Sequence, residues 1–259
     1  MASGIYTSMT GAMAQERALE SVSHNLANAL TPGFKRQQDT FEAIRTEVEG
    51  RISDPEQAPG VPEPKRELLE DRIGASHNAR HTLWAQGALK KTDNTLDVAL
   101  AGGGLFEVQS PDGQPRYTRN GALTLRPDGT LVSHQGLPII DASGGTIQIP
   151  DDAKDISITL EGKITSQGDE IGQLKVVKFD APQDLIREGG SLYSAPQGAN
   201  PQADTGTQVI QGRLEQSTVN AISSMTQMIR TQRVFDFNTK AIQTYQQMDS
   251  QAATDIARP

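Results

Sequence analysis

The 259-residue sequence contains no cysteine, and aromatic residues make up only 4% of it. Without cysteine the chain has no disulfide bond, no thiol nucleophile and no cysteine-ligated metal site. No run of lysine and arginine is longer than two residues, and the formal net charge is −8. Because a nucleic-acid partner needs a concentrated basic surface, we expect the chain to bind no nucleic acid.

Long hydrophobic runs are also absent. No stretch of 18 apolar residues occurs, and no positive charge precedes Arg17. A membrane-spanning helix needs such a stretch, and a secretory signal peptide needs a positive charge followed by an unbroken apolar run. We therefore expect no insertion into a membrane and no cleaved signal peptide.

Catalytic and cofactor-binding motifs are incomplete. The three glycines at residues 102–104 lack the lysine and hydroxyl of a phosphate-binding loop and precede a predicted strand, which favours a tight bend. His77 and His81 are spaced to share one helical face, but no zincin glutamate lies between them. His24 and His134 are isolated, and no Gly-x-Ser-x-Gly elbow occurs. We predict no catalytic residue, no cofactor and no metal site.

The first segment of the chain has the pattern of an amphipathic helix over residues 3–30. The members of its apolar stripe lie at or near a seven-residue spacing: Ile5, Met9, Ala12, Leu19, Val22 and Leu26. This spacing is typical of coiled-coil-like seams. Pro32 and Gly33 end the helix, because proline disfavours the helical conformation of the residue before it.

The last segment predicts a longer amphipathic helix. It starts near Ser217 or Asn220, either of which can cap the first turn, and runs to about Ala253. Its stripe opens with three apolar residues and continues after a phase slip of about one residue: Ile222, Met225, Ile229, then Phe235, Asn238, Ile242, Tyr245 and Ala252. A helix of this length spans about 50 Å, more than the small middle of the chain can cover. We expect its stripe to pack on another protein surface.

Glutamines outnumber charged residues along this last helix. Gln232, Gln243, Gln247 and Gln251 are close to i,i+4 spacing, which places them on one face. Glutamine is a fair helix former, so an ordinary solvated face is one explanation. The second hypothesis is that these four residues face a water-filled passage that must not retain passing chains by charge or by apolar contact.

We assign residues 1–44 and 209–259 to the two helical segments. Two regions of different composition lie between them. Residues 45–72 are rich in proline, glycine and charge, which predicts an extended strut, or alternatively a loop that orders only on assembly. The alternating acidic and basic residues there are typical of a solvated face and not of a paired-carboxylate glycosidase site. Residues 73–208 predict a β domain of short antiparallel strands, so the expected fold class is α+β.

Evenly spaced turn signals mark this β domain. Asp-Gly, Asn-Gly, Asp-Gly and Gln-Gly pairs begin at residues 112, 120, 128 and 135, and each glycine predicts a hairpin turn because it accepts a positive φ. The predicted strands are residues 117–118, 123–125, 131–133, 146–149, 156–160, 163–165 and 173–179. The last of these is the most apolar and is predicted to lie in the centre of a sheet.

Five motifs resemble the family of flagellar rod and hook axial proteins. They are HNLANALTPGFKR at residues 24–36, LDVAL at 96–100, YTRNG at 117–121, GLPIID at 136–141 and LEQSTVNA at 214–221. Together they span nearly the whole chain. Residues 119–121, 138–149 and 174–179 look more like the proximal-rod members, whereas the long insertion at 45–72 is a trait of the distal-rod members.

The resemblance implies a non-enzymatic structural subunit of the rod that crosses the periplasm in the flagellar basal body. It also implies export through the flagellar type III apparatus and assembly with copies of itself and with sister rod proteins. The terminal helices would form an inner tube around the export channel, with the β domain outside. The residues expected at the assembly interface are Ile5, Met9, Ala12, Leu19, Asn25, Leu26, Asn28, Gly33, Phe34, Ile222, Met225, Ile229, Phe235, Ile242 and Tyr245. Under the second hypothesis for the four glutamines, the passage that they face is this channel.

Two functions of other classes stay open at this point. One is a secreted hydrolase of cell-wall glycan that carries helical appendages. The other is a periplasmic glycan-binding module, which needs a platform of exposed aromatic residues. The middle of the chain offers few aromatic residues for such a platform.

Overall fold

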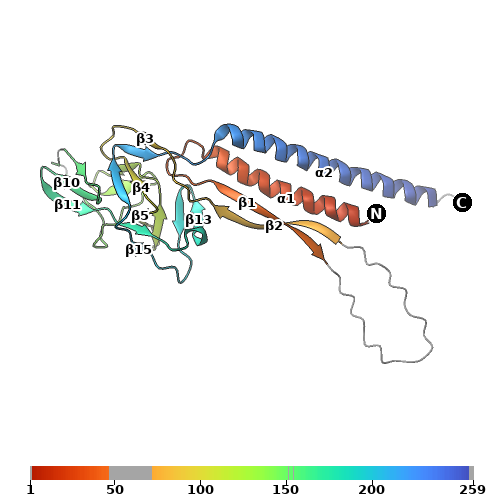
Figure 1. Ribbon diagram of the computed structural model, residues 1–259, viewed down its shortest axis with the longest axis horizontal. Coiled ribbons are helices and arrows are strands. Elements are labelled where there is room, and N and C mark those ends of the chain that lie inside the picture. Colours follow the sequence, from red (N-terminus) through yellow and green to blue (C-terminus); the bar gives the residue numbers. More distant parts are fainter. Residues whose placement is uncertain (1, 47–71, 151, 154, 257–259) are drawn as a thin grey trace, which may run out of the picture. The chain divides into compact units, whose positions relative to one another are not determined.

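The computed structural model describes residues 2–46, 72–150, 152–153 and 155–256, so the strut predicted at 45–72 lies almost entirely outside the described residues. Two long helices, α1 (Ala2–Ala27) and α2 (Ala221–Ile256), stand at the ends of the chain, and antiparallel strands lie between them in sequence (Figure 1). The predicted α+β class is therefore confirmed. No helix of the described residues has both the length and the apolar content to cross a membrane.

The chain divides into two compact units. The helical unit comprises Met1–Ser23, Gln38–His81 and Met225–Pro259, and the β unit comprises His24–Gln37 and Thr82–Ser224. The β unit therefore contains the segment that follows α1 and the segment that precedes α2.

Helix α1 ends three residues earlier than predicted. The backbone N–H groups of Asn28 and Ala29 donate to the carbonyls of Asn25 and Leu26 at 3.1 Å, so the last turn tightens to i+3 bonding. Gly33 then adopts a φ of +70°, in the left-handed region that favours glycine. The turn that the Pro-Gly pair predicted is thus present, and it begins directly after the helix.

Helix α2 starts where the capping chemistry predicts. The side-chain oxygen of Asn220 accepts a hydrogen bond from the backbone N–H of Ser223 (3.1 Å), which satisfies one of the free donors of the first turn. Asn220 is therefore the N-cap, and Ser217 is not. The helix continues for 36 residues to Ile256, slightly beyond the predicted end.

Within the helical unit, α1 and α2 run antiparallel side by side (Figure 1). Small residues of α1 allow a close approach: a Cβ on Gly4 would lie 2.8 Å from the Tyr245 ring, and one on Gly11 would lie 3.2 Å from the Asn238 amide. Farther along α1, the buried side chains are Ala14, Ala18, Ser21 and Val22. The two helices therefore already cover part of each other's surface inside one chain.

Two long strands complete this unit. β1 (Gln37–Thr46) and β2 (Arg72–Thr82) form a two-stranded sheet, and the Arg80 side chain bonds Asp39 (Nε–Oδ1 3.1 Å) and the carbonyl of Arg17 on α1. His77 and His81 lie on β2, so the helical face that their spacing suggested is wrong. Four residues of strand separate them by about 13 Å, too far for one metal ion.

The β unit is built around one larger sheet. Six strands pair in the order β13-β14-β6-β5-β12-β15, and shorter two- and three-stranded sheets surround them. The strands of the unit are β3 (Leu89–Lys91), β4 (Val98–Ala101), β5 (Leu105–Gln109), β6 (Pro115–Thr118), β7 (Leu123–Leu125), β8 (Leu131–Ser133), β9 (Ser157–Ile158), β10 (Lys163–Ser166), β11 (Asp169–Gln173), β12 (Val176–Lys178), β13 (Ile186–Gly189), β14 (Leu192–Ser194), β15 (Gln202–Ala203), β16 (Gln208–Gln211) and β17 (Arg213–Glu215), with the 3-10 helix η1 (Pro182–Asp184). Apolar residues from both sides of β5 fill two buried clusters, one of them around Phe106 and the other around Tyr117 and Tyr193.

Three predictions in this unit needed correction. Residues 146–149 form isolated bridges only, to Ile140 and Thr130, and not a strand. The strand predicted at 173–179 shortens to β12, which lies between β5 and the short edge strand β15 and not at the centre of the sheet. The glycine of the Asn120-Gly121 pair makes no positive-φ turn. A Cβ there would lie 1.8 Å from the Val98 carbonyl oxygen, so close backbone approach explains this glycine.

The other turn predictions are confirmed. Gly113, Gly129 and Gly136 have φ values of +79°, +77° and +77°. Their Asp and Gln predecessors therefore mark hairpin turns, as the pairs predicted.

Candidate functional site

A buried cluster of three charged residues lies in the β unit. The Glu215 carboxylate accepts hydrogen bonds from Lys35 (Nζ–Oε1 2.5 Å) and from Arg119 (Nε–Oε2 2.5 Å). All three side chains are at most 2% exposed. The backbone N–H of Gly87 also donates to Glu215. We call Lys35, Arg119 and Glu215 the junction, because it joins the segment after α1, the sheet and the segment before α2.

Burial and charge act against each other on Glu215. Burial alone would raise the pKa of this carboxyl, but the positive charge of Arg119 and the hydrogen bonds from Lys35 and Arg119 outweigh it, so the pKa is lowered. Burial is the main influence on Lys35 and lowers the pKa of its amine, while Glu215 opposes this effect. A carboxylate between two cations is therefore held in its charged form.

Two of the three consecutive glycines, Gly102 and Gly104, contact this cluster. Arg119 donates to the carbonyl oxygens of Gly102 and Gly104, and to that of Leu100. A Cβ on Gly104 would lie 2.4 Å from Val176. Their function is thus to bring backbone acceptors close to a buried guanidinium, in agreement with the tight bend that we predicted.

The Gly33-Phe34 pair fits tightly against the junction. The backbone N–H of Gly33 donates to the carbonyl of Glu215 (2.8 Å), and a Cβ on Gly33 would lie 2.5 Å from the backbone of Arg119. Phe34 is fully buried, with the Arg187 guanidinium carbon 4.1 Å from its ring centroid. Glycine is therefore needed at position 33 for both its φ and its lack of a side chain.

The two asparagines of the first motif also make contacts inside the chain. Asn25 is buried and bonds the backbone of Gln37 twice, as donor at 2.8 Å and as acceptor at 2.9 Å. Asn28 donates to the carbonyl of His24 at 2.9 Å. The structure thus places Asn25, Asn28, Gly33 and Phe34 where they fix the turn after α1, with their contacts made inside the chain.

Sequence reasoning missed the junction, although three of the five motifs each contain one of its members. Lys35 lies in the first motif, Arg119 in the third and Glu215 in the fifth. The available signal was the presence of a charged residue in each of these three motifs.

The other residues predicted to form the assembly interface lie on the two helices. They form two groups that differ in the exposed fraction of their side chains. Met9, Ile222, Met225 and Ile229 are exposed, whereas Ile5, Ala12, Leu19, Leu26, Phe235, Ile242 and Tyr245 are half-buried. The exposed apolar residues of the two helices that lie outside the predicted stripes are Tyr6, Met13, Val234, Phe237 and Met248. Together the nine exposed residues have between 45% and 79% of their surface open.

The stripe predicted on α2 divides into two faces. Six residues separate Ile229 from Phe235, about one and two-thirds turns, so they point about 120° apart. The half-buried part, with Phe235, Ile242 and Tyr245, is the face turned toward the rest of the helical unit, since Tyr245 contacts Gly4 of α1. The exposed part, which starts with Ile222, is a separate surface.

The glutamines continue this exposed surface. Gln243 follows Met225 by eighteen residues and Gln247 follows Ile229 by the same interval, which is five full turns. Gln232, Gln243, Gln247 and Gln251 are all exposed. Along this side of α2, the exposed residues are first apolar, then charged at Arg233, Asp236 and Lys240, and then glutamine.

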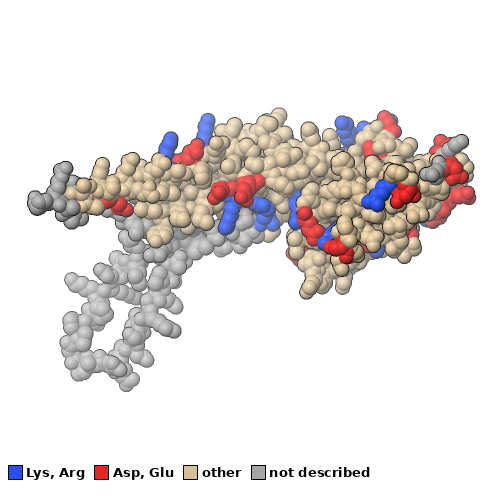
Figure 2. Space-filling view, turned by 180° about the vertical axis from the view of Figure 1, so that it is seen from behind, with Lys and Arg blue, Asp and Glu red and all other residues tan. Residues whose placement is uncertain are grey.

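Charged side chains are scattered on the helical unit. On the face seen in Figure 2, uncharged surface predominates over the helices, and the acidic and basic residues gather more densely over the β unit.

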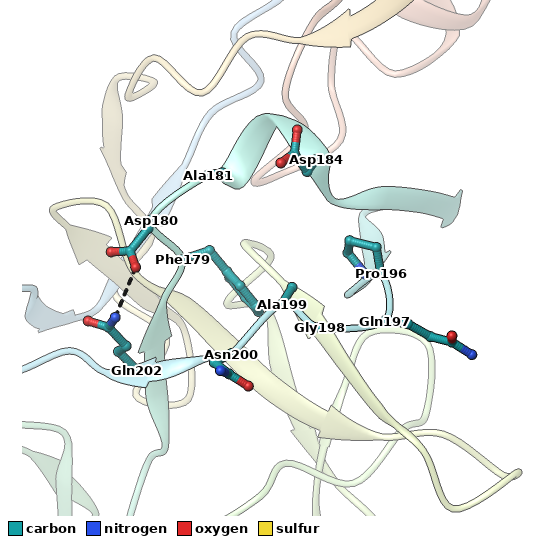
Figure 3. Close-up of a pocket in the computed structure, with 10 residues that line it drawn as sticks. All are labelled: Phe179, Asp180, Ala181, Asp184, Pro196, Gln197, Gly198, Ala199, Asn200 and Gln202. Atoms are coloured by element: carbon teal, nitrogen blue, oxygen red, sulfur yellow. Dashed lines mark hydrogen bonds between the residues drawn. The ribbon is translucent and has the colours of Figure 1, made fainter.

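The β unit also contains a hollow that has the size of a small-ligand site. Its volume is about 450 Å³, and it lies between the end of β12, η1 and the loop before β15 (Figure 3). Asp180 accepts a hydrogen bond from Gln202 (3.0 Å), and Phe179, the one aromatic residue that lines the hollow, is buried. The lining offers no exposed aromatic platform and no histidine, and the described residues hold no cluster of three or more metal-ligating side chains.

Comparisons with known proteins agree with the motifs. Family models described as "Flagella basal body rod protein", "Flagellar hook protein FlgE/F/G D1 domain" and "Flagellar basal body rod FlgEFG protein C-terminal" match residues 5–35, 99–166 and 210–255. The flagellar basal-body rod protein FlgG of Buchnera aphidicola subsp. Schizaphis graminum is 35% identical over 96% of this chain and 97% of its own length. FlgG of Agrobacterium fabrum is 33% identical, over 93% of this chain and 94% of its own.

Relatives named FlgF are similar to this chain as well. The flagellar basal-body rod protein FlgF of Rhizobium meliloti is 32% identical over 99% of this chain and 97% of its own length. The family that the motifs predicted is confirmed: the chain belongs to the flagellar basal-body rod protein family.

Proposed function

We propose that this chain is a structural subunit of the flagellar basal-body rod and that it polymerises through the exposed faces of its terminal helices. The observation that carries the proposal is the set of nine large apolar side chains exposed on α1 and α2. Burial of apolar surface gains about 25 cal/mol per Å², so such a set favours association in water. The relatives are named as rod proteins and not as enzymes, and the proposed function includes no catalysis.

In the proposed assembly, helices α1 and α2, which lie within the predicted assembly segments 1–44 and 209–259, pack in a coiled-coil-like tube. Copies of this chain and sister rod proteins are its neighbours, and residues 73–208 form the outer β domain. Within the predicted interface, Met9, Ile222, Met225 and Ile229 contact neighbours directly. The half-buried stripe residues support the helix pair that presents them.

The glutamines on α2 are proposed to line the passage of the tube. They share one side of the helix with Met225 and Ile229, so the apolar part packs on a neighbour while the polar part faces water. Lysine substitutions at Gln243 and Gln247 are expected to leave assembly intact and to slow export. Unchanged export from such a rod would contradict this assignment.

Passage through the flagellar type III export apparatus belongs to the same proposal, and so does the location in the basal body. Most of the stability of a protein helix comes from the packing of its apolar face, so burial of the exposed faces of α1 and α2 on assembly stabilises both helices. Circular dichroism of the free chain, compared with that of the assembled rod, measures how much helix forms on joining.

The choice between proximal and distal rod type is part of this proposal. We favour the proximal type, because residues 119–121 and 174–179 look like the proximal members. Relatives named FlgG and FlgF match over similar lengths. Expression of this chain in strains that lack either protein distinguishes the types, since only the matching strain regains motility.

Deletion of residues 225–259, the part of α2 that belongs to the helical unit, tests the function as a whole. A rod subunit should lose incorporation while the deleted chain keeps the circular dichroism signal and the melting of its strands. A glycan-binding module would keep its ligand, and a glycan hydrolase would keep its activity. Incorporation of the deleted chain into rods would contradict the proposed function.

A further inference from the structure

All six methionines of the chain lie in its terminal segments, at positions 1, 9, 13, 225, 228 and 248. The residues from 14 to 224, which include the whole β unit, contain none. The chain also has no cysteine, so methionine is its sole sulfur-containing residue type. Its sulfur chemistry is therefore confined to the helices.

Four of the five methionines that the structure describes are exposed. Between 46% and 52% of the surface of Met9, Met13, Met225 and Met248 is open. Met228 is half-buried and serves as an internal comparison. Exposure of this extent gives a small oxidant access to the thioether.

The four residues sit among the other exposed apolar side chains. Met9 and Met13 follow Tyr6 at the i+3 and i+7 positions of α1, and thus share its face. On α2, Met225 lies on the same face as Ile222 and Ile229. Met248 follows Phe237 by eleven residues, close to three full turns. Each exposed methionine therefore belongs to the surface through which the chain is proposed to assemble.

We infer that these four methionines are oxidation sites that control assembly. The inference rests on the proposed function. The oxidant is a hydroperoxide such as hydrogen peroxide. The sulfur lone pair attacks one peroxide oxygen, the O–O bond breaks, and the second oxygen leaves as water after proton transfer. Sulfur loses two electrons, peroxide gains them, and the products are methionine sulfoxide and water.

The chemical change reverses the character of the surface. A flexible apolar side chain adapts to the neighbour on which it packs, whereas a sulfoxide carries a strong acceptor that needs a hydrogen-bond partner. A polar group buried without such a partner weakens an interface by about tenfold or more. The oxidised chain therefore stays unassembled, and methionine sulfoxide reductase returns it to the competent form.

The test compares the full chain with two variants before and after hydrogen peroxide. The first variant carries Met9→Leu, Met13→Leu, Met225→Leu and Met248→Leu, and the matched control carries Met228→Leu. Association of the chain, alone or mixed with sister rod proteins, is followed by analytical ultracentrifugation. Peptide mass spectrometry gives the order in which the methionines are oxidised.

We expect peroxide to weaken association of the wild-type chain and of the Met228→Leu control about tenfold or more, and to leave the fourfold variant unchanged. The four exposed methionines should oxidise before Met228. If the fourfold variant fails to fold, recovery of association after reductase treatment of the oxidised wild-type chain decides the question.

Unchanged association of the fully oxidised wild-type chain overturns the inference and leaves the proposed function intact. A loss of association that reductase treatment does not reverse also overturns the inference and leaves the proposed function intact. An untreated chain that joins neither itself nor sister rod proteins overturns the proposed function instead, and the inference with it.

Discussion

Arg119 and Glu215 form a buried ion pair, with the arginine Nε 2.5 Å from the carboxylate Oε2. Ninety-six residues of chain separate them. Lys35 completes the junction from the opposite end of the sequence. The stability of the β unit therefore depends on charges that come from three distant segments.

The first prediction concerns the loss of the central charge. Glu215→Gln leaves Lys35 and Arg119 buried without a counterion, so we expect the free energy of unfolding to fall by about 3–5 kcal/mol. Urea denaturation followed by circular dichroism measures this change. Glu188→Gln is the matched control, because Glu188 pairs with Arg116 at a partly exposed site and should cost at most about 1 kcal/mol. Equal losses in the two variants would contradict the role of the junction.

The second prediction concerns pH. The pKa of Glu215 is lower in the folded chain than its ordinary value of 4.5, so the folded state binds fewer protons there than the unfolded state does. Its contribution to stability is fully present above pH 4.5 and is lost as the pH falls through the lowered pKa. The stability of the wild-type chain should therefore drop more steeply below pH 4.5 than that of Glu215→Gln.

Other carboxyls add to the same acid transition. Hydrogen bonds lower the pKa of Asp141 and of Asp204 against the opposing effect of their burial. The informative quantity is thus the difference between the wild-type and variant profiles, measured by chemical denaturation from pH 7 to pH 3. Parallel profiles would show that Glu215 does not titrate differently in the folded chain.

The third prediction concerns Gly33. Gly33→Ala forces an L-residue into the left-handed region, at a cost of about 1–2 kcal/mol, and places a methyl group against the Arg119 backbone. We expect a loss of stability larger than the conformational cost alone, measured by thermal denaturation. Gly145→Ala is the control, since no atom lies within 4 Å of the added Cβ and φ is not positive there. A neutral Gly33→Ala would refute the account of the turn.

The fourth prediction separates the two faces of α2. Ile229→Asp changes an exposed position and should alter the stability of the chain by at most about 0.5 kcal/mol, yet abolish assembly, because the interface would bury an unpaired charge. Ile242→Asp changes the half-buried face and should destabilise the helical unit itself. Circular dichroism of each variant and its incorporation into rods give the two readouts. Normal rods from Ile229→Asp would remove that residue from the interface.

Local chemistry was predictable from the sequence, and long-range packing was not. The cap at Asn220 and the turns at Gly113, Gly129 and Gly136 depend on neighbouring residues, so short motifs indicated them. The contact between Lys35 and Glu215 spans 180 residues, and no local pattern signals it. The junction therefore appeared only when the strands were in place.

The helix faces show a second limit of the sequence. Heptad spacing identified apolar residues on α1 and α2, but it did not reveal which of them face the interior. That choice depends on close approach at Gly4 and Gly11, where small residues let the helices meet. Residues 146–149 show a third limit: their apolar alternation suits a strand, yet their partners form only single bridges.

The junction also has a practical consequence. Lys35 and Glu215 are bonded to each other, so they hold together the two ends of the chain segment between them. An affinity tag or fluorophore inserted at the open turn of Gly144 and Gly145 would lengthen this segment without moving its two ends. Such a tag would let single subunits be followed in living cells while the helices stay native.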